Sequence, residues 1–169
     1  MGKLLAKRGI GLVYGGGNVG LMGIVADAVM AHGGEAIGVI PQALADREIA
    51  HSGITQLHVV DSMHTRKAMM AELSDGFVAM PGGVGTFEEF FEVVTWTQLG
   101  VHRKPCGLLN VNAFYTPLAV FIDQAVAEGF IKPIHRAAIV IESDPSRLLN
   151  SLATVDLPNV PKWIGREET

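Results

Sequence analysis

The sequence has 169 residues, 49% of them hydrophobic and 18% charged, with a formal net charge of −4. This length is typical of one domain with a substantial core, and the acidic balance argues against broad nucleic-acid binding, which needs a basic face. No apolar run reaches the roughly 18 residues of a membrane-spanning helix, and no signal peptide is recognisable. The single cysteine, Cys106, excludes an internal disulfide and a cysteine cluster for a metal. We therefore expect a cytoplasmic protein without membrane association.

Short apolar runs alternate with amphipathic segments along the chain. A first short helix is expected at 4–8, with Gly9 as its cap. The expected buried parallel strands are 10–14, 36–40, 57–60, 76–80, 106–110 and 137–141. The expected helices are 19–32, 63–73, 86–99, 114–128 and 145–152. This order predicts one doubly wound, Rossmann-like α/β domain over residues 1–153, followed by an extended tail, 154–169.

The apolar composition carries a second implication. The mean hydropathy is +0.32, which is high for a chain with a fully solvated surface. Either the sheet is covered on both faces, or part of the surface is buried against another subunit.

The first candidate site is the glycine-rich loop YGGGNVG at 14–20, between a predicted strand and a predicted helix. Gly15, Gly17 and Gly20 satisfy the dinucleotide-binding pattern, in which backbone N–H groups approach a phosphate. An NAD site would also need an acidic residue at the end of the next strand, but that strand ends in GVIP (38–41). NAD is therefore disfavoured, and a phosphate contact and a simple tight turn both remain open.

The second candidate site opens the predicted helix 63–73. Asp61 or Ser62 can cap this helix, which places Arg66 and Lys67 in its first turns. Cations there oppose the helix dipole at a cost of roughly 0.3–1 kcal/mol each. Either a nearby anion offsets that cost, or the two residues form a solvated basic pair on the helix surface.

The third candidate site is the loop PGGVGTFEE at 81–89. Thr86 is expected to cap the following helix, with Glu89 completing a capping box. A cap does not explain the glycines at 82, 83 and 85, which suggest a nest of backbone amides for an anion. The lysine of a P-loop is missing, so ATP hydrolysis of that type is disfavoured.

Together these segments resemble the Lonely Guy family, the cytokinin riboside 5′-monophosphate phosphoribohydrolases, many of which were once labelled lysine decarboxylases. Residues 81–89 match the family signature PGGxGTxxE at every fixed position, and 13–17 with 20–23 match its first glycine loop. Met63-His64 with Arg66-Lys67 matches its Met-His-x-Arg-Lys element, with Thr65 where relatives often carry Glu. The resemblance covers nearly the whole chain, and the sequence is expected to lack the family's N-terminal strand.

The resemblance implies hydrolysis of an N-glycosidic bond, which releases an adenine-type base and ribose 5-phosphate. It assigns Glu89 to stabilisation of the developing oxocarbenium charge, and Arg66 to positioning of the ribose. The remaining residues implied in substrate binding are Gly16, Gly17, Glu48, Lys67, Gly82, Gly83, Val84, Gly85, Thr86, Phe87 and Glu88. The implied reaction requires no metal and no redox cofactor. The resemblance also implies a homodimer with active sites near the subunit interface.

The same sequence features bear on three other functions. A broader nucleosidase acting on AMP, and a nucleotide or cofactor carrier without catalysis, would use the same loops, so both remain open. Lysine decarboxylation is rejected, because no lysine lies in a recognisable pyridoxal-phosphate context.

Overall fold

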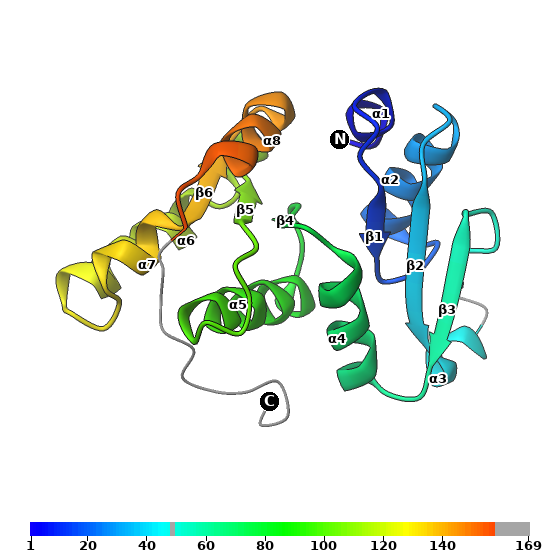
Figure 1. The fold of residues 1–169 in the computed structure, drawn as a ribbon, viewed down its shortest axis with the longest axis horizontal. Coiled ribbons are helices and arrows are strands. Elements are labelled where there is room, and N and C mark those ends of the chain that lie inside the picture. Colours follow the sequence, from blue (N-terminus) through cyan, green and yellow to red (C-terminus); the bar gives the residue numbers. More distant parts are fainter. Residues whose placement is uncertain (48–49, 158–169) are drawn as a thin grey trace. The chain divides into compact units, whose positions relative to one another are not determined.

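A computed structural model describes residues 1–47 and 50–157 of the chain. The fold divides into two compact units, Met1–Ser74 and Asp75–Thr169, and each is described by itself. Figure 1 shows both units as a ribbon coloured along the sequence. No helix among the described residues is long and apolar enough to cross a membrane.

The first unit is a three-stranded parallel sheet with helices packed on it. Its strands are β1 (Leu12–Tyr14), β2 (Ala36–Pro41) and β3 (Gln56–Val60), in the order β1-β2-β3 (Figure 1). Its helices are α1 (Gly2–Lys7), α2 (Gly20–Met30), α3 (Gln42–Ala45) and α4 (Met63–Leu73). Nearly every residue of β2 is buried, as expected for a central parallel strand covered on both faces. In this unit the loops that follow β1, β2 and β3 lie at the carboxyl edge of the sheet, where α/β proteins place ligands.

The second unit has the same construction. Its strands are β4 (Phe77–Ala79), β5 (Cys106–Leu109) and β6 (Ile139–Glu142), which pair in parallel in that order. Its helices are α5 (Val84–Gln98), α6 (Thr116–Ala127), α7 (Pro133–Ala137) and α8 (Pro145–Thr154), with a short 3₁₀ turn, η1 (Val111–Ala113), before α6. The core of this unit is built from β4, β5, β6, α5 and α6, and its buried members are Ala79, Phe90, Val94, Cys106, Leu108, Tyr115, Ile122 and Ile139.

The structure confirms the α/β class, the six predicted strands and the six predicted helices, with boundaries shifted by a few residues. Gly9 follows α1 with φ of +65°, as its predicted role as a cap requires. The prediction that a strand begins at 137 was wrong, because α7 continues through Ala137 and β6 begins at Ile139. Helix α8 also extends to Thr154, the first residue of the predicted tail, while 158–169 lie outside the described residues. The single domain over 1–153 stays a prediction.

Candidate active site

Helix α4 places Arg66 at the start of a capped helix. Ser62 is the N-cap, and its hydroxyl oxygen accepts a hydrogen bond from the Thr65 backbone N–H at 3.1 Å. The Thr65 hydroxyl donates to the Asp61 carboxylate at 2.5 Å. Hydrogen bonds from Thr65 and Ser62 lower the pKa of Asp61. The predicted cap is thereby confirmed, and it fixes Arg66 within the first turns of α4.

Arg66 is buried, with a relative exposure of 8%. Its Nε donates to the backbone carbonyl of Val39 on β2 at 3.2 Å, and its Nη1 lies 4.0 Å from Sδ of Met63. This environment excludes the alternative of a solvated surface charge for Arg66. A guanidinium is costly to bury, and the structure holds this one against backbone at the carboxyl ends of β1 and β2. The energetic cost of burying a guanidinium is more typical of a functional site than of a contact that stabilises the fold.

The first glycine-rich loop forms a tight turn beside Arg66. Gly16 has a left-handed φ of +71°, and a side chain there would lie 3.1 Å from both Ile40 and Leu57. Gly16 and Gly17 are both buried. Their burial supports the tight-turn interpretation of these two glycines, and their contact with a phosphate stays a prediction.

His51, in the segment between α3 and β3, anchors this loop. Its backbone N–H donates to the Gly16 carbonyl at 2.8 Å, and Gly17 forms an antiparallel bridge with Ala50. The His51 ring accepts a hydrogen bond from the Gly53 N–H at Nδ1, so Nε2 carries a proton and donates to Asp27 at 3.1 Å. We did not predict this role, because nothing in the sequence distinguishes His51 from the other scattered histidines.

Tyr14 lies in the same part of the first unit, directly before the loop. Its side chain is buried, and its hydroxyl has no hydrogen-bond partner among the described residues. Burial, together with the negative charge of Asp27, raises the pKa of Tyr14 to about 12. The hydroxyl therefore stays protonated at neutral pH and adds no charge behind the loop.

The second glycine-rich loop leads directly into helix α5. The predicted capping box was wrong: the N-cap is Gly83 in an extended conformation, and no side chain caps the helix. The first helical hydrogen bond runs from the Phe87 N–H to the Gly83 carbonyl at 3.2 Å. Thr86 lies inside the first turn, where its side chain packs so closely on Gly82 that a Cβ there would be 2.9 Å from Cβ of Thr86. Helix α5 thus starts at Val84, two residues before Thr86, with Gly83 rather than Thr86 as its N-cap.

Gly83 and Gly85 have no packing reason to be glycine. A Cβ added at either position would meet no atom within 4 Å, and neither residue has a positive φ. The backbone N–H groups of Val84, Gly85 and Thr86 precede the first helical hydrogen bond, so they have no acceptor within the helix. Val84 is 82% exposed. The open start of α5 therefore presents backbone donors and a positive helix end to solvent, which suits an anion.

Tyr115 holds this loop in place. Its hydroxyl donates to the Met80 carbonyl at 2.6 Å, directly before the loop, and its ring meets Phe87 edge to face at 6.3 Å. Tyr115 is 1% exposed, and burial raises its pKa. We did not single out Tyr115 from the sequence, since its role depends on a contact 35 residues away.

The predicted site residues are distributed over both units. Arg66, Lys67 and the first glycine loop belong to the first unit, and residues 82–89 belong to the second. Glu89 is half-buried and Glu88 exposed, both one turn beyond the open start of α5. Glu48 lies outside the described residues. No group of three or more potential metal ligands occurs within residues 1–47 and 50–157.

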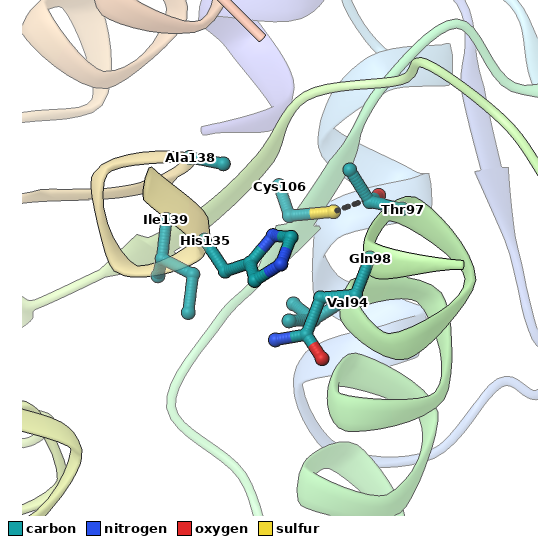
Figure 2. Close-up of a pocket in the computed structure, with 7 residues that line it drawn as sticks. All are labelled: Val94, Thr97, Gln98, Cys106, His135, Ala138 and Ile139. Atoms are coloured by element: carbon teal, nitrogen blue, oxygen red, sulfur yellow. Dashed lines mark hydrogen bonds between the residues drawn. The ribbon is translucent and has the colours of Figure 1, made fainter. Parts of the chain in front are cut away.

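A small pocket in the second unit is separate from these residues. It is about 10 Å³ in volume and is lined by Val94, Thr97, Gln98, Cys106, His135, Ala138 and Ile139 (Figure 2). Sγ of Cys106 lies 3.9 Å from the Thr97 hydroxyl, and burial raises the pKa of this thiol to about 11. Because the volume is close to that of a single water site, the pocket is too small for a nucleotide.

Comparison with known proteins identifies the class to which this fold and these loops belong. The family model described as possible lysine decarboxylase matches residues 22–152. The chain is 54% identical over 145 residues to a cytokinin riboside 5′-monophosphate phosphoribohydrolase of Rhodococcoides fascians, covering 85% of this chain and 73% of that protein. It is 53% identical over 152 residues to a probable cytokinin riboside 5′-monophosphate phosphoribohydrolase of Oryza sativa subsp. japonica, covering 90% of this chain and 62% of that protein.

The chain therefore belongs to the Lonely Guy family, as the sequence motifs indicated, although it spans less than two thirds of the rice relative's length. Among solved structures, the molybdenum cofactor binding protein of Rippkaea orientalis matches with a TM-score of 0.65 and 23% identity. That match covers 90% of this chain and 83% of that one. At this identity the likeness supports the Rossmann-like fold alone.

Proposed function

We propose that the protein hydrolyses the N-glycosidic bond of cytokinin riboside 5′-monophosphates and releases the free base and ribose 5-phosphate. The observation that carries this proposal is the open start of α5, where Gly83 and Gly85 leave space for a ligand beside backbone amides that have no acceptor within the helix. Family membership and the identity to relatives with this named activity support it.

In the proposed reaction the bond between the anomeric carbon and the base nitrogen breaks, and its electron pair leaves with the base. The anomeric carbon then carries positive charge, which the Glu89 carboxylate stabilises. Water adds its hydroxyl to that carbon, and its remaining proton balances the one taken up by the departing base. Arg66 positions the ribose phosphate for this step.

The amides of Gly82, Gly83 and Gly85 and the Thr86 hydroxyl are proposed to hold the 5′-phosphate. Backbone donors at a helix start suit this role, because they bind an anion without a metal. Further contacts with the substrate are proposed for Gly16, Gly17, Glu48, Lys67, Val84, Phe87 and Glu88.

Release of free base tests the proposed function directly. Purified protein incubated with isopentenyl-AMP, and separately with AMP, is expected to yield free base detectable by chromatography, with the modified nucleotide cleaved faster. Equal or faster cleavage of AMP would identify a broader nucleosidase instead. Tight nucleotide binding without base release, from a folded sample, would point to a carrier and would contradict hydrolysis.

We also propose that the protein is a cytoplasmic homodimer with its active sites near the subunit interface. The high mean hydropathy supports an apolar contact surface. Large exposed side chains such as Phe121 and Phe130, at 66% and 86% exposure, are also consistent with one. Sedimentation at micromolar concentration is expected to give twice the monomer mass of 18.0 kDa, and a monomer mass there would contradict the proposal.

A further inference from the structure

Gly15 is a glycine for a different reason from Gly16 and Gly20. Gly16 and Gly20 have positive φ values of +71° and +58°, conformations that favour glycine. Gly15 has no positive φ, so its backbone would accept an alanine. The requirement for glycine at this position must come from space.

The space beside Gly15 is filled by the Arg66 guanidinium. A Cβ added at Gly15 would overlap Nη2 of Arg66, and it would lie 3.1 Å from Cζ and 3.5 Å from Nε. The three nearest atoms all belong to the end of that one side chain. Because such a group can rotate away more easily than backbone can shift, a side chain at Gly15 would displace Arg66 and leave the turn in place.

We propose that Gly15 is a positioning residue for Arg66: its bare Cα lets the guanidinium lie directly on the first glycine loop. There the Val39 carbonyl accepts the Nε–H at 3.2 Å, and Sδ of Met63 lies 4.0 Å from Nη1. The guanidinium is thereby held by the loop after β1, by strand β2 and by its own helix α4. The functional consequence rests on the proposed function, in which Arg66 contacts the substrate.

Gly15→Ala is expected to reduce kcat by about tenfold to a hundredfold, since displacement of a positioning group by about 1 Å can have an effect of this size. KM is expected to change less, because the phosphate is held by the second loop. The matched control is Gly11→Ala, also in the first unit, just before β1. A Cβ there would lie 3.7 Å from the Glu35 carboxylate, an ordinary contact, so this variant should keep the parental rate.

A double-mutant cycle with Arg66→Ala tests the mechanism. If Gly15 acts through Arg66, Gly15→Ala has no further effect on kcat in the Arg66→Ala background. An equal loss in both backgrounds, or no loss in the parent, would overturn the inference. Retained turnover in Arg66→Ala alone would instead count against the proposed function.

A readout independent of activity separates failure of this inference from failure of the proposed function. The Arg66 Nε–H is hydrogen-bonded and buried, so its NMR signal should be shifted and slow to exchange with water. It is assigned by its loss in Arg66→Lys. In Gly15→Ala the signal is expected to move and to exchange faster, while thermal unfolding stays cooperative. An unchanged signal would overturn the inference whatever the activity.

Discussion

Replacing Glu89 with glutamine is expected to reduce kcat by about a thousandfold or more while the protein remains folded. Glutamine keeps the size of the side chain but removes the negative charge that we propose stabilises the oxocarbenium carbon, and such electrostatic terms contribute several kcal/mol to the barrier. A purely structural role as a cap is no longer available to Glu89, because α5 begins at Val84. The measurement is single-turnover release of base from isopentenyl-AMP.

The control for Glu89 is Glu92→Gln. Glu92 lies one turn further along α5 and is also a half-buried carboxylate. This variant is expected to keep kcat within about threefold of the parent, because no contact with the substrate is proposed for Glu92. Similar losses in both variants would show that the effect is one of helix stability, and a fully active Glu89→Gln would remove Glu89 from the mechanism.

Replacing Arg66 gives the second large effect. Arg66→Ala is expected to reduce kcat/KM by about a hundredfold to a thousandfold, and Arg66→Lys is expected to recover little of it. Lysine keeps the charge but lacks the planar fork of donors, and only that fork can bond Val39 and also make the substrate contact that we propose. Retained turnover in the alanine variant would contradict the assignment.

Chemical rescue distinguishes a missing functional group from a damaged fold. Millimolar guanidinium is expected to restore part of the turnover of Arg66→Ala, whereas ammonium at the same concentration is not. Arg136→Ala serves as the control: it also removes a guanidinium, one that pairs with Asp123 at 2.6 Å in the second unit. That variant should be fully active and unresponsive to guanidinium.

The strands and long helices were predictable because their apolar periodicity is local. The run 36–41 is apolar at nearly every position, which is the pattern of a strand buried on both faces. The helices α3 and α7, of four and five residues, are too short to show a period. The start of α5 was misplaced because a Thr-x-x-Glu pattern predicts a cap, whereas the helix begins at Val84 without any side-chain cap.

The candidate site residues could be singled out from the sequence as residue types, but their environments could not be predicted. The sequence shows a cation near a helix start, yet the burial of Arg66 depends on a carbonyl 27 residues earlier in the chain. Contacts of this range also determine the roles of His51 and Tyr115, whose partners lie 24 and 35 residues away. No local pattern encodes such distances, so these contacts become visible only in the folded structure.

The buried thiol of Cys106 makes the protein well suited to site-specific labelling. The chain has a single cysteine, and its pKa of about 11 leaves only about one part in ten thousand as reactive thiolate at pH 7. A maleimide dye would therefore react almost exclusively with a cysteine introduced at an exposed position away from the proposed subunit contact, for example in place of Lys3. Cys106 therefore need not be removed before fluorescence labelling, because it contributes almost no dye of its own.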